Sequence, residues 1–289
     1  INGNTLVSKG AHTGSSVRLF NLENNEFDNS SQTYLSGFPY YEGKIGFSSG
    51  YLFGSNSSIY EIDTDYKLQE VGSFSPGFGN LNYYQIVDDK LLRIVNYTFE
   101  VYDLSIPLAP QKIFATEIFS HTTDFWQFNT IKDNHVYAST ASGLFHISFN
   151  ESGEILDSGY ITEEDSGGIL LDGDYLYQQT QSNTNGYDLN IWNIATATQP
   201  ILKRTINDYN SSALNGKILK YKNWLILEGY NESTILDISN PENTFEIERT
   251  QIKPSLDPFR ENVIHNNDLI FSNYGQLIRF EINEAPKVV

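Results

Sequence analysis

The stretch STILDISNP, residues 233–241, decides the fold because weaker copies of it recur from one end of the chain to the other. The last apolar residues of the seven copies are Leu22, Ile62, Leu104, Ile147, Ile194, Ile238 and Ile282, at spacings of 40, 42, 43, 47, 44 and 44 residues. The polar residues directly before them are Asn21, Glu61, Asp103, His146, Asn193, Asp237 and Glu281. An apolar or aromatic residue recurs two positions further back. This alternation predicts a half-buried β-strand in every copy.

A two-residue turn followed by an apolar run precedes each copy of this strand. The turns begin at Asn2, Ser49, Asp88, Asp133, Asp172, Lys222 and Asn266. Asn-Gly, Asp-Gly and related pairs supply the positive φ angles of tight hairpins. Further strands are expected before the turns, as at residues 213–219 and 262–265, and after the copies, as at 245–252 and 111–118. One repeat is therefore four antiparallel strands, here called a, b, c and d.

Four-stranded antiparallel sheets that repeat about every 43 residues predict an all-β fold, a seven-bladed β-propeller. A two-sheet sandwich would not require this period. We expect residues 1–289 to form a single propeller domain with blades at about 1–37, 38–77, 78–120, 121–165, 166–208, 209–256 and 257–289. The first repeat begins at strand b and lacks its inner strand. Either flanking residues complete the ring, or the first blade has three strands.

The composition restricts the partners that the protein can have. The net charge of −18 argues against nucleic acid and anionic membrane surfaces, because both attract clustered Lys and Arg. No run of 18 apolar residues is present, so we expect no membrane insertion. Cysteine is absent, which excludes disulfides and thiol chemistry. The chain begins at Ile1 and contains no Met, which indicates a trimmed or mature fragment.

Three copies of the repeat resemble a known family. VYDLSIPLAP at 101–110, IWNIATATQP at 191–200 and ILDISNPEN at 235–243 are similar to the LVIVD repeat of secreted and cell-surface proteins in bacteria and archaea. The resemblance implies a propeller in an extracytoplasmic setting, secreted or on the cell surface. It brings no shared catalytic residues.

The d-to-a and b-to-c connections of a propeller lie on one face around the central funnel, where ligands usually bind. The d-to-a segments are rich in aromatic residues, and we expect a ligand-binding surface of Tyr40, Tyr41, Tyr83, Tyr84, Phe125, Trp126, Tyr209, Phe259 and Arg260. Rigid rings give contact area at low entropic cost. The b-to-c loops at 139–143 (STASG) and 179–188 (QTQSNTNGYD) are small and polar. The alternative is that the rings cap the core at the ends of strand a.

Acidic pairs in turns are weak candidates for a metal site. The pairs Asp63 with Asp65 and Asp172 with Asp174, and the run 163–165, offer the oxygen ligands that Ca²⁺ prefers. None completes a calcium-binding loop. The prediction is therefore no cofactor, with Ca²⁺ as the alternative. The five histidines show no zinc spacing. His146 falls in the polar slot before Ile147, which predicts a structural hydrogen bond, and His121 is expected near the funnel.

These observations favour a noncatalytic binding or scaffold module, extracytoplasmic or on the cell surface, that presents the aromatic funnel face to a protein or glycan. We expect a monomer or a part of a longer chain. The first alternative is a structural propeller domain of a larger surface protein. The second is a propeller hydrolase or lyase, in which two carboxylates act as acid and base. Its candidate carboxylates are Asp124, Glu163, Asp165, Asp208 and Asp257.

Overall fold

The computed structural model describes part of the chain. The described residues are 5–9, 16–21, 32–34, 45–54, 57–62, 68–74, 81–95, 98–117, 128–140, 142–164, 166–181, 186–196, 199–210, 218–228, 233–250, 263–265, 268–273 and 276–281. The chain divides into two compact units. Unit 1 comprises Ile1–Thr122 and Glu151–Glu154, and unit 2 comprises Thr123–Asn150 and Ile155–Val289.

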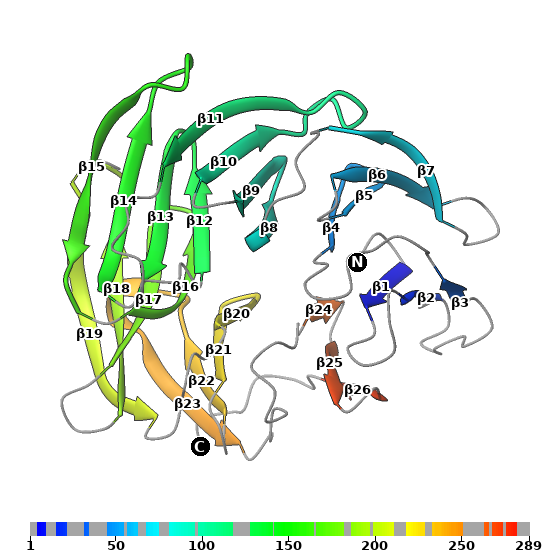
Figure 1. Ribbon diagram of the computed structural model, residues 1–289. Helices are drawn as coiled ribbons and strands as arrows, with labels where there is room; N and C mark the ends of the chain where they lie inside the picture. The colour runs from blue at the N-terminus through cyan, green and yellow to red at the C-terminus, as the bar shows by residue number, and fades with distance from the viewer. Residues whose placement is uncertain are drawn as a thin grey trace. The chain divides into compact units, whose positions relative to one another are not determined.

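Unit 1 holds three antiparallel sheets whose strands are neighbours in chain order (Figure 1). The first sheet consists of β1 (Thr5–Lys9), β2 (Ser16–Asn21) and β3 (Gln32–Tyr34). The second consists of β4 (Ile45–Ser48), β5 (Tyr51–Gly54), β6 (Ser58–Ile62) and β7 (Leu68–Ser73). The third consists of β8 (Leu81–Val87), β9 (Lys90–Val95), β10 (Thr98–Asp103) and β11 (Gln111–Glu117).

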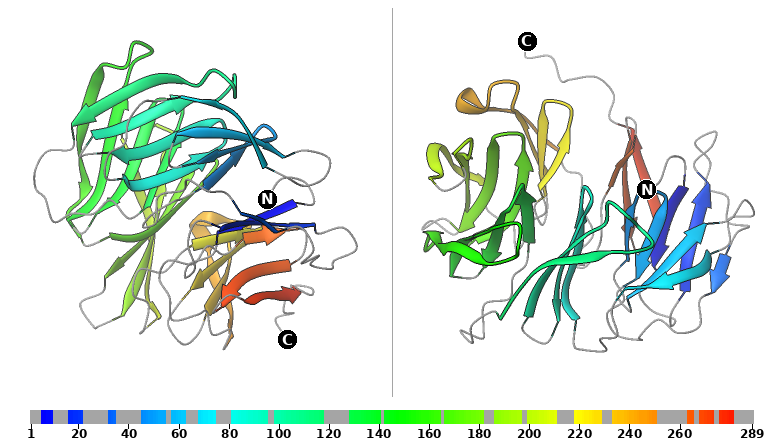
Figure 2. Two further views of the ribbon diagram at one scale, coloured as in Figure 1. Left: turned by 45° about the vertical axis from the view of Figure 1, so that its right-hand side comes forward. Right: turned by 90° about the horizontal axis from the view of Figure 1, so that it is seen from above.

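Unit 2 holds four more sheets of the same meander type (Figure 2). The first sheet consists of β12 (Phe128–Lys132), β13 (His135–Thr140), β14 (Gly143–Phe149) and β15 (Ile155–Thr162). The second consists of β16 (Ser166–Asp172), β17 (Tyr175–Gln181), β18 (Tyr187–Asn193) and β19 (Ile201–Asn210). The third consists of β20 (Ile218–Tyr221), β21 (Trp224–Glu228), β22 (Ser233–Asp237) and β23 (Phe245–Thr250), with the short 3₁₀ helix η2 (Pro241–Asn243) before its last strand. The fourth consists of β24 (Val263–His265), β25 (Asp268–Asn273) and β26 (Gln276–Glu281).

The prediction of repeated antiparallel sheets is confirmed for the described residues. Each sheet falls within one predicted repeat, except that β19 extends to Asn210, two residues past the expected boundary at 208. The first sheet has three strands in the described residues. None of the helical segments in the described part of the chain has the length and apolarity of a membrane span.

In the described chain the turns predicted at Ser49, Asp88, Asp133 and Lys222 lie where the sequence places them, and the turn predicted to begin at Asp172 begins at Gly173, because Asp172 pairs with Tyr175. Four residues other than glycine adopt the positive φ of such turns, namely Ser49 at 50°, Asp88 at 53°, Asp133 at 53° and Lys222 at 52°. In the turn between β16 and β17, Gly173 has a φ of 59°. Primed turns of this kind match the right-handed twist of the strands that they join. The local sequence therefore determines where each strand a ends and strand b begins.

The predicted position of the repeat residue is wrong in one sheet. The backbone N–H that follows strand c donates to the a–b turn, from Leu104 to Asp89 and from Ile194 to Asp174. In the sheet β12–β15 the equivalent donor is Phe149, at 3.0 Å from the Asn134 carbonyl. Phe149, not Ile147, is therefore the repeat residue. The two uneven spacings around it, 43 and 47, become 45 and 45.

The polar residue directly before the repeat residue ends strand c. Its side-chain oxygen accepts a hydrogen bond from the backbone N–H two residues later, at 2.8 Å for Asp103, 3.0 Å for Asn193 and 2.7 Å for Asp237. Asp and Asn commonly form such turns. In the sheet β12–β15 this slot holds Ser148, so the placement of His146 in it was wrong. His146 lies two residues earlier, in the middle of β14.

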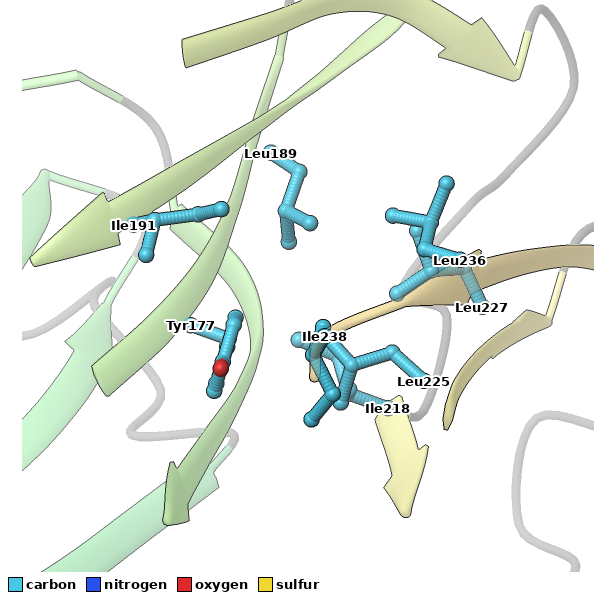
Figure 3. Packing of buried hydrophobic residues seen from close by; sticks show 8 residues of the cluster. All are labelled: Tyr177, Leu189, Ile191, Ile218, Leu225, Leu227, Leu236 and Ile238. Atoms are coloured by element: carbon cyan, nitrogen blue, oxygen red, sulfur yellow. The ribbon is translucent and has the colours of Figure 1, made fainter. Parts of the chain in front are cut away.

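The core of unit 2 lies between neighbouring sheets. Figure 3 shows Tyr177, Leu189 and Ile191 of the sheet β16–β19 facing apolar side chains of the sheet β20–β23. The opposite face of β16–β19 packs on the sheet β12–β15 through a second cluster. That cluster contains Tyr137, Leu144, Ile169, Leu176, Trp192 and Ile194. Because both faces are covered, polar side chains in these strands need partners within the protein.

A buried ion pair lies in the core of unit 1. Arg93 of β9 and Glu100 of β10 are 2% and 8% exposed. The Arg93 Nε donates to Glu100 Oε2 at 2.7 Å, and its Nη1 donates to Ser57 Oγ at 3.0 Å. The Tyr102 hydroxyl accepts from Arg93 Nη2 at 2.9 Å. Arg93 thereby joins the sheet β8–β11 to Ser57, the residue before β6 in the neighbouring sheet.

The charge of Glu100 is stabilised against its burial. Burial alone would raise the pKa of the Glu100 carboxyl. The hydrogen bond from Lys112, at 3.0 Å, and the charge of Arg93 outweigh burial and hold the pKa below its ordinary value. The pair therefore remains ionised at neutral pH.

We predict that Arg93→Met lowers the free energy of unfolding by about 3 kcal/mol, because it leaves Glu100 buried beside a partner that is half exposed. Lys112→Met is the control and should cost less than about 1 kcal/mol, since Lys112 lies at the surface. Urea unfolding followed by circular dichroism measures both. Equal losses for the two variants would contradict the assignment of Arg93 as the principal partner.

Candidate functional site

Polar side chains gather at one end of the unit 2 sheets, where strand b ends and strand a begins. This is the end that the sequence assigns to the funnel. The predicted b-to-c loops at 139–143 and 179–188 are shorter than expected, because β13 continues to Thr140 and β17 to Gln181. Ser139, Thr140, Gln179 and Thr180 are therefore strand residues, and all four are buried.

A β-bulge interrupts the inner strand β16 at this end. Ser166 pairs with Thr180 and Ile169 pairs with Gln178, so Gly167 and Gly168 together oppose a single residue, Gln179. The bulge removes regular ladder bonds. Gln179 Oε1 compensates by accepting a hydrogen bond from the Gly168 N–H at 3.1 Å. A Cβ on residue 167 would lie 3.3 Å from the Gln179 Cβ, so only glycine fits without displacement.

Two further side chains hold the bulge in place. Ser139 reaches across from β13, and its hydroxyl donates to the Ser166 carbonyl at 2.7 Å and lies close to the Gly167 carbonyl. Gln178 donates from Nε2 to Ser166 Oγ at 3.1 Å. Its Oε1 accepts from Trp192 Nε1 at 2.9 Å. We call Ser139, Ser166, Gly167, Gly168, Gln178 and Gln179 the polar bulge site.

One donor of this site has no partner. Gln179 is fully buried, and its Nε2 makes no hydrogen bond. The amide cannot be flipped, because Oε1 must face the Gly168 N–H. Among the described residues only one other buried side-chain atom lacks a partner, the hydroxyl of Tyr177, which lies two residues earlier on the same face of β17. An unpaired buried donor needs an acceptor oxygen from a water or ligand.

The structure gives the position of only some predicted ligand-binding residues. Tyr83 and Tyr84 are strand residues in β8, and Tyr209 is a strand residue in β19. The others lie outside the described residues; they are Tyr40, Tyr41, Phe125, Trp126, Phe259 and Arg260.

Two of the five carboxylates proposed for acid–base chemistry lie among the described residues. Glu163 is exposed in the link between β15 and β16, and Asp208 is a residue of β19. Asp124, Asp165 and Asp257 lie outside the described residues. Within the described chain, no carboxylate belongs to the polar bulge site.

Asp172 and Asp174, two of the weak calcium candidates, have protein partners. They flank Gly173 in the β16–β17 turn, at the opposite end of the sheet from the polar bulge site. Lys220 of β20 forms an ion pair with Asp172, and Lys132 of β12 forms one with Asp174. The pairs connect three successive inner strands. Asp63 and Asp65 lie outside the described residues, and no group of three or more metal-ligating side chains occurs in the described part of the chain.

Two adjacent glycines are the sequence signal for this bulge. Glycine inside a strand often marks a bulge or a close approach of backbone. Gly167 and Gly168 follow Ser166, the first residue of β16, shortly after the acidic run at 163–165. The role of Gln179 could not be read from the sequence, because its partner Gly168 is determined by the register of the hairpin.

Solved structures resemble the chain in fold. A provisionally named 6-phosphogluconolactonase from Bacteroides fragilis aligns with a TM-score of 0.65 and 10% identity over 98% of this chain and 91% of that one. The periplasmic gluconolactonase of Pseudomonas aeruginosa aligns with a TM-score of 0.65 and 10% identity, over 96% and 91%. A protein from Lactobacillus plantarum gives 0.67 and 10%, over 96% and 91%. At this identity the likeness shows the fold alone, an all-β fold of the β-propeller type.

Sequence comparisons give no family. No protein-family model matches the chain, and no curated protein matches it.

We predict that Ser139→Ala lowers the free energy of unfolding by about 1–2 kcal/mol, because it leaves the buried Ser166 carbonyl without its donor. Ser158→Ala, at an exposed position of β15, is the control and should change stability by less than about 0.5 kcal/mol. Chemical denaturation measures both variants. If the two substitutions had equal effects, the Ser139 hydroxyl would not be holding the bulge.

Proposed function

We propose that the protein is a seven-bladed β-propeller that acts as a noncatalytic, extracytoplasmic binding module for a neutral, hydroxyl-rich ligand such as a glycan. The observation that carries this proposal is the unpaired Gln179 Nε2 in a site built from hydroxyl, amide and backbone groups. Hydroxyl oxygens of a sugar are suitable acceptors for such a donor. The extracytoplasmic setting rests on the LVIVD-like repeats.

The uncharged character of the site favours a neutral ligand. The Gln179 amide carries no charge and lies on the same face of β17 as Tyr177, towards the sheet β20–β23. Ser139 and Gln178, which hold the bulge from the opposite face, are uncharged as well. With a net charge of −18 on the chain, an anionic ligand would be repelled unless a cation lay beside it. Neutral sugars need only hydrogen bonds and aromatic faces. The predicted aromatic residues of the d-to-a segments would supply the faces.

A glycan array followed by calorimetry tests this function. Gln179→Glu keeps an oxygen for the Gly168 N–H and removes the amide donor, so we predict that the dissociation constant for an array hit rises about tenfold or more. Gln111→Glu makes the same exchange at an exposed site and should leave binding unchanged. Unchanged binding by a folded Gln179→Glu variant would exclude the polar bulge site as the place of contact.

The predicted aromatic surface has its own test. We expect the double variant Tyr84→Ala, Trp126→Ala to lose most of its binding to the same array hit, because stacking on sugar faces would be removed. Thermal unfolding of the variant shows whether it remains folded. Full binding by a folded double variant would place the contact elsewhere and leave the two rings with a packing role.

Sugar lactone hydrolysis is the second candidate function. One protein of similar fold is provisionally named a 6-phosphogluconolactonase and another a gluconolactonase, and a lactone carbonyl could accept from Gln179 Nε2 as a sugar hydroxyl would. This function needs a general acid or base in addition to the polar bulge site. Incubation with glucono-lactone, with base uptake followed at constant pH, separates the two functions. Base uptake at a rate that scales with protein concentration would show that the protein is an enzyme and not a noncatalytic binding module.

A further inference from the structure

Two histidines stack within the sheet β12–β15. His135 begins β13 and His146 lies in β14, with ring centroids 5.2 Å apart and planes inclined by 12°. The His135 Nδ1 and His146 Nε2 atoms are 2.9 Å apart. At that separation one nitrogen donates and the other accepts, so the N–N line holds a single proton. His146 is 5% exposed, whereas His135 is only partly buried, so the pair lies at the edge of the packed region with its His146 ring inside.

This arrangement is stable only while at least one ring is neutral. Burial lowers the pKa of His135, although Asp133 opposes the shift. Burial lowers the pKa of His146 as well, and the His135 ring lowers it further while Asp157 opposes the shift. With both rings protonated, two N–H groups and two positive charges would meet at one contact. The contact would then open.

The histidine pair is the element of this region that responds to acid, as its charged and titratable neighbours show. Asp157 on β15 and Asp133 in the preceding turn favour protonation. Lys132, which pairs with His135 across β12 and β13, is itself ion-paired to Asp174 of the next turn. Tyr137 contacts the His146 ring with centroids 5.2 Å apart, and burial raises the pKa of its phenol. Tyr137 therefore remains neutral at any pH at which the histidines titrate.

Strand β13 connects the pair to the polar bulge site. Alternate residues of a strand point to one face, so His135, Tyr137 and Ser139 follow one another along the same side of β13. Tyr137 packs in the cluster with Trp192 of the next sheet, and Trp192 donates to Gln178 of the site. Ser139 binds the bulge directly. A displacement of β13 at His135 would therefore move Ser139 and disturb the Trp192–Gln178 contact, the two interactions that hold the bulge.

We propose that protonation of the His135–His146 pair shifts β13 against β16 and releases the ligand of the polar bulge site in mildly acidic surroundings. The ligand part of this inference rests on the proposed function; the movement of the bulge does not. The coupling is carried by Ser139 and by the Tyr137–Trp192–Gln178 contacts.

The direction of the pH effect follows from the neutral state of the folded pair. A histidine with a lowered folded-state pKa contributes stability that is complete above its unfolded value of about 6.5 and is lost as the pH falls below it. The bulge is therefore held at pH 7.5 and loosens as the pH falls below about 6.5. If binding requires loss of one proton, the dissociation constant rises by up to about tenfold per pH unit in that range.

The test compares the wild-type protein with His135→Asn and His146→Gln, whose amides can hydrogen-bond without titrating. His265→Gln, on β24 of another sheet, is the matched control. The first measurement follows the amide NMR resonances of Gly167 and Gly168 from pH 7.5 to 5.5, without ligand. We expect them to shift in step with the two imidazoles in the wild type and the control, and to stay fixed in the other two variants.

The second measurement follows the dissociation constant of a glycan-array hit over the same pH range. A rise of tenfold or more in the wild type and the control, with little change in the two amide variants, is the expected result. Glycine resonances that stay fixed while the imidazoles titrate would overturn the inference. So would equal pH dependence in all four proteins. If no glycan binds at pH 7.5, the proposed function fails, and the glycine resonances still decide whether the pair moves the bulge.

Discussion

Packing of one sheet face on the next is the constraint on which the described structure depends. The sheet β16–β19 is covered on one face by apolar residues of β12–β15 and on the other by those of β20–β23. Strands buried on both faces leave their polar side chains no access to solvent, so every such group needs a protein partner. Arg93 meets this requirement with a buried carboxylate, and Ser139 meets it with the carbonyls of a bulge. The polar groups thereby specify how neighbouring sheets align.

The Gln179 amide nitrogen does not meet this requirement, because it has no hydrogen-bond partner. Its neighbour Gln178 satisfies both ends of its amide, and its own oxygen is satisfied by Gly168. Leaving a buried donor unpaired costs about 1–3 kcal/mol, which is a substantial part of the stability of an ordinary domain. A methionine would fill the same volume without such a donor. Groups of this kind are typical of functional sites, where binding is favoured at the expense of stability.

The sequence was sufficient for the hairpins and for the sheets, because turn residues such as Asp88 and Lys222 determine local backbone conformation. It was insufficient for features that depend on which residues of neighbouring strands pair with each other. The repeat residue of the sheet β12–β15 was misplaced by two positions, since Ile147 and Phe149 both fit an alternating pattern and only the bond to Asn134 distinguishes them. The bulge and the His135–His146 contact depend in the same way on register between strands. A slip of two residues keeps each side chain on its face, so the apolar pattern could not reveal the error.

The corrected register also explains why acid should act at one place. Between pH 7.5 and 5.5 ordinary carboxylates stay ionised, and histidine is the side chain whose ordinary pKa falls in this window. The net charge of −18 attracts protons over the whole surface, whereas burial opposes protonation at His146. Had His146 occupied the slot that terminates strand c, its ring would have capped a surface turn, as Asp103 does. Its actual place, two residues earlier and opposite Tyr137, puts the proton acceptor inside the packing between sheets. A charge gained there acts on the contacts that hold the bulge, whereas a charge gained at a surface turn would be screened by solvent.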